Sequence, residues 1–136
     1  YPLPCMTVDL GTASTYNAIS ADRRFLGGFI VPGVQTSLRA ISAGTAQLPP
    51  IAPEAPARLI GKNTEECLNS GAVYGTAAML EGLADRVEAE LGAPLTVVAT
   101  GGLARGIIPC CRRDILFDGD LLFKGLAVLY RRNRPR

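Results

Sequence analysis

Residues 8–15 read Val8-Asp9-Leu10-Gly11-Thr12-Ala13-Ser14-Thr15, and this stretch decides the fold. The apolar run from Cys5 to Val8 leads directly into an acid, a glycine and a cluster of hydroxyls. Glycine lets a backbone approach an anion closely because it has no Cβ. The order therefore predicts a strand that ends in a phosphate- or cation-binding turn. The alternative is a β-hairpin in which glycine and serine only turn the chain.

Each polar residue of this turn has its own chemistry. The backbone N–H groups at Gly11 and the hydroxyls of Thr12 and Thr15 can donate to phosphate oxygens. Asp9 cannot bind an anion directly, but its carboxylate suits a hard cation that neutralises one. The site lies very near the beginning of the sequence, so we expect that more chain precedes Tyr1.

The composition is that of one compact domain. The chain has 136 residues, 48% of them hydrophobic and 19% charged, with a formal net charge of +2. That length supports a real core, and a charge so small steers no strongly charged partner. The absence of histidine excludes Ser-His-Asp and Cys-His catalysis and histidine metal sites. Proton transfer would need a carboxylate, lysine, tyrosine or cysteine.

Cysteine spacing and hydropathy bear on the compartment. Cys5, Cys67, Cys110 and Cys111 form no C-x-x-C motif, so we expect reduced thiols in a cytoplasmic protein. No apolar run approaches the length of a membrane span. The arginines that end the chain suit a helix C-terminus better than a nucleic-acid surface, since aromatic residues do not alternate with them. We therefore expect neither a membrane nor a nucleic-acid partner.

Apolar patterns and turn residues predict an α/β layout. Strands are expected at residues 6–10, 15–20, 25–31, 96–99 and 115–117, and helices at 34–43, 64–91 and 121–130. A further short helix should run from Thr100-Gly101-Gly102 to about Ile108, and the four prolines of residues 44–58 indicate a loop. This order predicts a ribonuclease H-like mixed sheet, three antiparallel strands followed by parallel ones, with helices on both faces.

The two longest helices differ in pattern. For residues 64–91, Asn63 and Glu66 form a capping box, and a seam of Gly71, Gly75 and Ala78 predicts a close helix neighbour in this chain or another subunit. Its apolar stripe comprises Val73, Leu80, Leu83, Val87 and Leu91. The helix 121–130 is apolar almost all round, so we expect it to be buried. Asp118 or Asp120 should cap its start.

Three turns that contain glycine could converge on one site. They are Asp9–Thr12, the pair Gly27-Gly28 with the following Pro32-Gly33, and Thr100-Gly101-Gly102. A helix that follows a parallel strand presents free N–H groups to an anion. An ordinary strand-to-helix turn is the alternative for the third, and we interpret Gly27-Gly28 as letting a helix pack close to its strand. Thr64 is either a polar substrate contact or part of the helix cap.

Taken in order, the motifs resemble the C-terminal half of a type III pantothenate kinase. The matching segments are Val8–Ala13, Gly27–Gly33, Thr45–Pro49, Ile60–Thr64, Ser70–Gly75, Ala99–Leu103 and Gly125–Asn133. Each segment is weak alone, but their order and spacing are specific, and the resemblance covers about Thr7 to Asn133. The resemblance implies a single domain over residues 1–136 that corresponds to one lobe of a two-lobed kinase.

That family belongs to the sugar kinase, Hsp70 and actin superfamily, whose two ribonuclease H-like halves clamp ATP. The resemblance implies phosphorylation of pantothenate, the first step of coenzyme A synthesis, by a homodimer that uses ATP, Mg²⁺ and potassium or ammonium. It implies that Asp9 binds the monovalent cation and that Gly11 and Thr12 contact ATP phosphate. Thr100, Gly101 and Gly102 would border the nucleotide, and Thr64 would contact pantothenate across the dimer interface.

The sequence departs from the family pattern in two places. The first phosphate loop (Asp-x-Gly-Asn-Thr) and the Gly-x-Asp-Arg motif with the catalytic base are not in this chain and should lie upstream of Tyr1. Asp22-Arg23-Arg24 also occupies a turn where glycine is usual. We therefore expect the chain alone to be inactive. The alternatives are a non-catalytic accessory or regulatory protein of the same fold, or a dimerisation module.

Overall fold

A computed structural model describes residues 1–44 and 51–134. Its sheet has the strand order β3-β2-β1-β4-β5. The strands are β1 (Cys5–Leu10), β2 (Ala13–Ile19), β3 (Phe25–Pro32), β4 (Thr96–Thr100) and β5 (Leu116–Phe117). Strands β1, β2 and β3 pair antiparallel, whereas β4 lies parallel to both β1 and β5. The expected mixed ribonuclease H-like sheet is confirmed.

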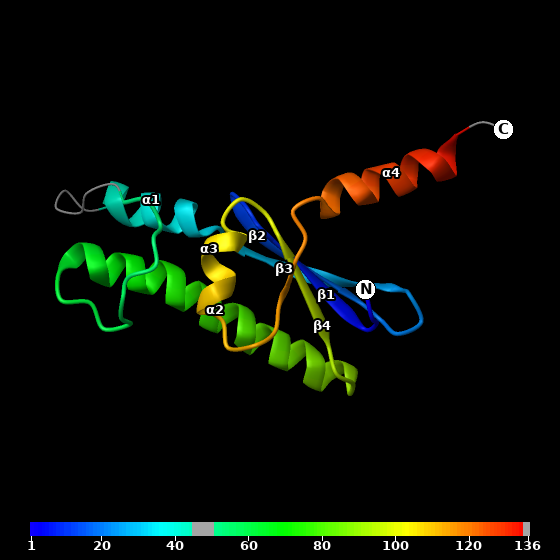
Figure 1. The fold of residues 1–136 in the computed structure, drawn as a ribbon, viewed down its shortest axis with the longest axis horizontal. Helices are drawn as coiled ribbons and strands as arrows, with labels where there is room; N and C mark the ends of the chain where they lie inside the picture. The colour runs from blue at the N-terminus through cyan, green and yellow to red at the C-terminus, as the bar shows by residue number, and fades with distance from the viewer. Residues whose placement is uncertain (45–50, 135–136) are drawn as a thin grey trace.

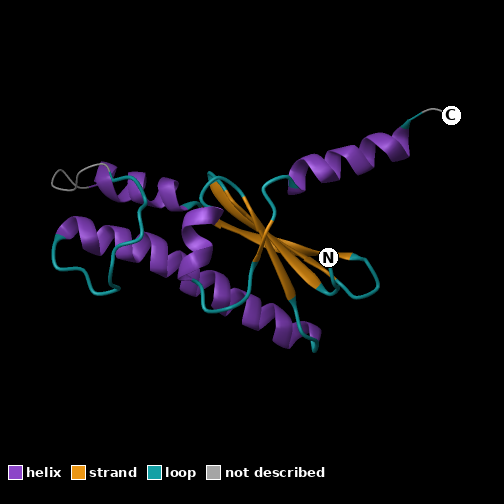
Figure 2. Ribbon diagram, viewed as in Figure 1, coloured by secondary structure: helices purple, strands orange, loops and turns teal. Residues whose placement is uncertain are grey.

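The helices are α1 (Val34–Gly44), α2 (Thr64–Leu91), α3 (Ala104–Ile107) with the 3₁₀ turn η1 (Ile108–Cys110), and α4 (Leu121–Asn133). Helices α1, α2 and α3 pack on one face of the sheet, while α4 extends away from the body (Figures 1 and 2). Of the family-like segments, residues 45–49 lie outside the described residues. No helix in the described ranges is long and apolar enough to cross a membrane.

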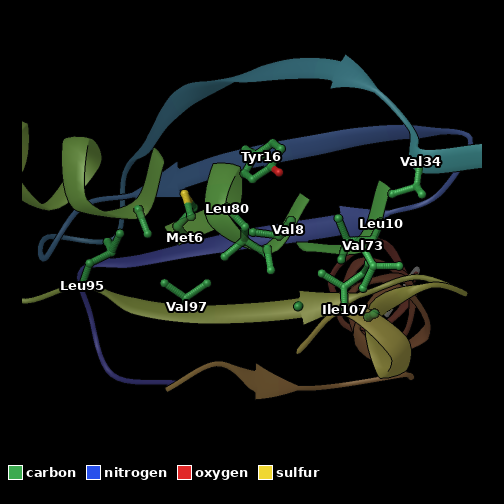
Figure 3. Close-up of a cluster of buried hydrophobic side chains, with 14 of the residues drawn as sticks. Met6, Val8, Leu10, Tyr16, Val34, Val73, Leu80, Leu95, Val97 and Ile107 are labelled. Carbon is green, nitrogen blue, oxygen red and sulfur yellow. The ribbon is translucent and has the colours of Figure 1, made fainter. Parts of the chain in front are cut away.

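The core lies between one face of the sheet and α2. Alternate residues of β1, which are Met6, Val8 and Leu10, are at most 1% exposed and belong to the same buried cluster as Leu80 and Ala84 of α2 (Figure 3). Because side chains alternate along a strand, Thr7 and Asp9 are placed on the opposite face. The period of β1 thus assigns one face to packing and leaves the other for chemistry.

The long helix forms where the capping pattern predicts it. The Asn63 side chain accepts a hydrogen bond from the Glu66 backbone N–H (2.9 Å), and the Glu66 carboxylate accepts one from the Lys62 N–H (2.7 Å). Gly92, at φ 65°, ends the helix. Of its predicted apolar stripe, Val73 and Leu80 are buried, and the other three residues are partly buried against the core.

Several local expectations are wrong. Gly28 lies against β2, not a helix: a Cβ there would be 1.8 Å from the Tyr16 carbonyl oxygen. Helix α4 has no buried residue at all. Its hydrophobicity indicates burial, but no other element in the described part of this chain buries its side chains. The turn at Arg23 has φ 65°, the conformation that glycine adopts readily, which accounts for glycine being usual there.

Candidate functional site

The candidate site begins at the C-terminal end of β1. Asp9 is registered with Thr15 on β2 and with Thr100 on β4. Residues directly opposite each other in a sheet project from the same face. A carboxylate is therefore flanked by two hydroxyls in one row across three strands, on the face opposite the core.

This row opens onto a hollow of about 680 Å³ between the sheet and α4. Its lining includes Thr7, Asp9, Thr15, Asn17 and Thr100 from the strands. The other side of the hollow is apolar and comes mainly from α4. The strands therefore supply most of the polar groups of this hollow, and Tyr1 and Lys124 supply the others.

The turns at Gly33 and at Gly101 both meet the Asp9–Thr12 turn next to that row. Gly101 has φ 97°, and a Cβ there would lie 2.6 Å from the Asp9 Oδ1 and 2.7 Å from the Leu10 backbone. A Cβ on Gly33 would lie 2.3 Å from the Gly11 carbonyl oxygen. Both turns thus press on the end of β1 so closely that only glycine fits. Gly27-Gly28 lies toward the other end of the β2–β3 pair and is not part of this contact.

Hydrogen bonds from Gly33 and from Thr36 on α1 hold the Gly11-Thr12 turn in place. The Thr12 carbonyl oxygen accepts hydrogen bonds from the Gly33 N–H (3.1 Å) and from the Thr36 hydroxyl (2.8 Å), whereas the Thr12 side chain is exposed. Gly101 and Gly102 follow β4 at the same edge of the sheet, since β1 and β4 are parallel. Two backbone turns with exposed hydroxyls and glycines therefore lie side by side, an arrangement that suits an anion.

The donors around Asp9 suit a hard cation in type. One carboxylate and the hydroxyls of Thr15 and Thr100 offer oxygen ligands only, which is the preference of hard cations. Within the described ranges, no group of three or more His, Cys, Asp or Glu side chains could hold a metal ion.

Thr64 lies elsewhere. It is the exposed first residue of α2 and is not among the residues that line the hollow over Asp9. Its neighbours Asn63, Glu65 and Glu66 line a separate hollow of about 410 Å³. The structure of one chain thus does not bring the expected substrate contact to the expected phosphate site.

Sequence reasoning did not predict the hydrogen-bonded cluster around Asp118. It is 6% exposed and accepts hydrogen bonds from the Tyr1 hydroxyl (2.5 Å), the Lys124 ammonium (2.7 Å) and the Asp120 N–H (3.0 Å). Tyr1 and Lys124 both line the hollow that contains Asp9. The available signal was an acid placed directly after an apolar run, the same pattern that singled out Asp9. Asp120 occupies the expected N-cap position of α4, but neither aspartate caps the helix through its side chain.

This cluster shifts the titration of its members. The hydrogen bond from Lys124, followed by that from Tyr1, lowers the pKa of the Asp118 carboxyl. The same contact with Asp118 raises the pKa of Lys124 and the pKa of the Tyr1 phenol. All three groups therefore keep their ordinary neutral-pH forms, with one anion held between a cation and a hydroxyl.

Comparison with known proteins gives consistent matches. Residues 1–86 match the family model described as type III pantothenate kinase. The chain is 42% identical over 135 residues to the type III pantothenate kinase of Caulobacter vibrioides, covering 98% of this chain and 52% of that protein. It is 43% identical over 133 residues to the one from Moorella thermoacetica, covering 98% and 52%. The chain thus spans about half the length of the curated relatives it matches.

A solved structure supports the fold. The crystal structure of a Baf family protein from Campylobacter jejuni superposes with a TM-score of 0.72 and covers 98% of this chain and 60% of that one. Its sequence identity is 22%, so this likeness supports the arrangement of helices and strands alone.

Proposed function

The chain belongs to the type III pantothenate kinase family, and on that premise we propose that it is the C-terminal half of an enzyme that phosphorylates pantothenate with ATP. The product would be 4′-phosphopantothenate, in the first step of coenzyme A synthesis. One observation carries the proposal. Asp9, flanked by Thr15 and Thr100, lies where the Gly11-Thr12 and Gly101-Gly102 turns meet.

In this proposal each side chain has a limited task. The Gly11-Thr12 turn donates to ATP phosphate, and Thr100, Gly101 and Gly102 border the nucleotide. Asp9 binds potassium or ammonium, while Mg²⁺ accompanies ATP. The pantothenate hydroxyl oxygen bonds to the γ-phosphorus as ADP leaves, and the proton passes to a base in the other half. Since phosphoryl transfer depends on positioning and charge neutralisation, this half alone should be inactive.

The substrate contact and the dimer belong together in this proposal. Thr64 would reach pantothenate bound to a second subunit. Gly71 and Gly75 have open space where a Cβ would stand, and they line an apolar groove of about 370 Å³ with Leu38 and Met79. The close helix neighbour expected at these glycines would then come from a second copy. All four cysteines are free, in keeping with the proposed cytoplasmic location.

The first experiment is the intact mass of the protein as the cell makes it. We expect about twice the 14.3 kDa of this chain. A mass near 14.3 kDa would leave the protein without a base and would favour the non-catalytic alternative. Pantothenate phosphorylation by the 136-residue chain alone would contradict the assignment of the base to the other half.

The site assignment is tested by Asp9→Asn in the full-length protein. We expect loss of potassium activation, because an amide carries no charge to hold the cation. Asp22→Asn is the matched control, since Asp22 is an exposed acid paired with Arg24 in the β2–β3 turn. Turnover is measured across a potassium series for both variants. Unchanged potassium dependence in Asp9→Asn would show that the cation is bound elsewhere.

A further inference from the structure

Helix α3 and the turn η1 end in two adjacent cysteines. Cys110 is the last residue of η1, and Cys111 is the residue that caps it. Both are free and both are partly buried. The proposed kinase reaction gives neither of them a task. Two neighbouring thiols can bind one ion through both sulfurs, which a single thiol cannot do, so the pair is a candidate binding site.

Both thiols are directed at the same end of α3. The Cys110 thiol donates a hydrogen bond to the Gly106 carbonyl oxygen (3.8 Å), and the Cys111 thiol donates one to the Ile107 carbonyl oxygen (3.6 Å). Gly106 and Ile107 are consecutive residues of α3, so the two sulfurs lie over neighbouring carbonyl groups. A thiol is a weak donor. Little free energy is therefore lost when the sulfurs turn toward a shared ligand.

The backbone around the pair is fixed. The Cys111 N–H donates to the Ile108 carbonyl oxygen (2.9 Å). The Glu81 carboxylate of α2 accepts the backbone N–H groups of Arg112 and Arg113, the second at 2.9 Å. Helix α3 lies beside α2 on the same face of the sheet (Figure 1). The segment that carries both sulfurs is thus held in place before any ligand binds, which reduces the entropy that binding would cost.

Tyr16 supplies a second, independent observation. Its side chain has 0% exposure, and its ring stacks on that of Phe29 with centroids 4.7 Å apart. Its hydroxyl oxygen (red in Figure 3) is the one buried side-chain oxygen or nitrogen in the described ranges without a hydrogen-bond partner. Cys111 packs against the cluster that contains Tyr16. A buried donor without an acceptor is unfavourable, and a thiolate at Cys111 would be an acceptor close to it.

We propose that Cys110 and Cys111 bind one soft monovalent metal ion as two thiolates, with the Tyr16 hydroxyl as a donor to the Cys111 sulfur. Thiolates select soft ions, among them Cu(I). Zinc also binds cysteine, but its structural sites use four ligands. No group of three or more His, Cys, Asp or Glu side chains in the described ranges could hold a metal ion. A soft monovalent ion needs only the two sulfurs.

Binding exchanges protons for the ion. Burial, followed by Glu81 and Cys110, raises the pKa of Cys111 to about 11, so the free thiol is protonated at neutral pH. One Cu(I) ion bonds to both sulfurs while two protons pass to water, and no atom is oxidised or reduced. The product carries one negative charge. Glu81 opposes that charge, whereas the exposed Arg112 follows the pair directly and favours it.

Competition with a chromophoric Cu(I) chelator under anaerobic conditions tests the site in the full-length protein. We expect Cys110→Ser and Cys111→Ser each to bind one equivalent of Cu(I) per chain fewer than the parent. Their affinity should fall by more than about 100-fold, because removal of a ligand costs more than removal of a residue that only orients one. Equal binding by the parent and both variants would overturn the proposal.

Cys67→Ser is the matched control. Cys67 is an exposed free cysteine on α2 with no cysteine beside it in the sequence. This variant should bind as much Cu(I) as the parent. A loss equal to that of Cys110→Ser would overturn the proposal, since it would show that single surface thiols hold the ion. Native mass spectrometry gives the ratio of copper to chain, and one copper per two chains would overturn the proposal in favour of a site shared between copies.

The tyrosine contact has its own test. Tyr16→Phe removes the buried hydroxyl and should lower the Cu(I) affinity roughly tenfold, the effect of one hydrogen bond to a charged group. Tyr74→Phe is its control and should leave the affinity unchanged, because that hydroxyl donates to the Pro56 carbonyl oxygen (3.0 Å). Unchanged affinity in Tyr16→Phe would overturn the contact with Tyr16.

Two features keep the test decisive. Circular dichroism verifies the fold of every variant, and Cys110, the more exposed of the pair, gives a usable variant even where Cys111→Ser does not fold. The inference does not rest on the proposed function, and pantothenate turnover is not its readout. A failure of the kinase proposal therefore leaves the copper measurement intact, and the reverse also holds.

Discussion

Helices α2 and α4 show how differently one chain can use apolar residues. The 28-residue α2 carries three glycines and many charges, yet it supplies Val73, Ala77, Leu80 and Ala84 to the core. The 13-residue α4 is richer in large apolar side chains and has none buried. An apolar residue stabilises this domain only where the same chain provides a surface to cover it.

The N-termini of α2 and α4 also differ, because only that of α2 is capped by a side chain. Asn63 caps α2 through its side chain, whereas Asp120 occupies the corresponding position of α4 without such a bond. Their polar anchors also differ: Arg113 binds Asp85 and Glu88 on the outside of α2, while Asp118 binds Lys124 at the base of α4. Helix α2 is therefore supported along its length and α4 at one end.

The largest contrast should come from matched leucine truncations in the 136-residue chain. Leu80→Ala removes a side chain with 0% exposure and should cost about 2–5 kcal/mol, because it leaves a cavity in the core. Leu126→Ala, at 52% exposure, should cost less than about 0.5 kcal/mol. Denaturant unfolding gives both values. Similar losses for the two would show that α4 packs within this chain.

The caps should give a smaller difference of the same sign. Asn63→Ala removes the acceptor of the Glu66 N–H and should destabilise the chain by about 1 kcal/mol. Asp120→Ala should change the stability by less, since its side chain makes no cap bond. Thermal unfolding of the two variants provides the comparison. A greater loss for Asp120→Ala would contradict the capping geometry.

The smallest effects should be those of pH on the two anchors. The hydrogen bond from Arg113 lowers the pKa of Glu88, as that from Lys124 lowers the pKa of Asp118. A lowered carboxyl pKa stabilises the fold above the unfolded pKa, and this stabilisation is lost as pH falls through the folded value. The raised pKa of Lys124 keeps its charge until pH exceeds that value.

We therefore expect the melting-temperature differences between the parent chain and Arg113→Gln, and between the parent chain and Lys124→Gln, to shrink in acid. The Arg113 difference should be the larger at neutral pH, because α2 belongs to the core and α4 does not. Both series are measured from neutral to acidic pH in moderate salt. A difference that grows as the carboxylates become protonated would contradict these ion contacts.

Much of the fold was predictable because its signals are local. The alternation of β1 and the capping box at Asn63 and Glu66 each act over a few residues. Local sterics and hydrogen bonds dictate such features before any tertiary contact forms. The row of Asp9, Thr15 and Thr100 depends on strand register, and here Gly33 and Gly101 converge on the end of β1 whereas Gly27-Gly28 does not.

The sequence by itself determined the succession of strands and helices along the chain, the long helix and the acid-glycine-hydroxyl turn that ends β1. Only the tertiary structure decided three matters: that Gly28 contacts β2, that Asp118 is buried under Tyr1 and Lys124, and that α4 stands uncovered. The physical reason is common to all three. Hydrophobicity and turn chemistry determine which conformation and which degree of burial a residue favours. Whether it is actually buried depends on which surface, in this chain or another, packs against it.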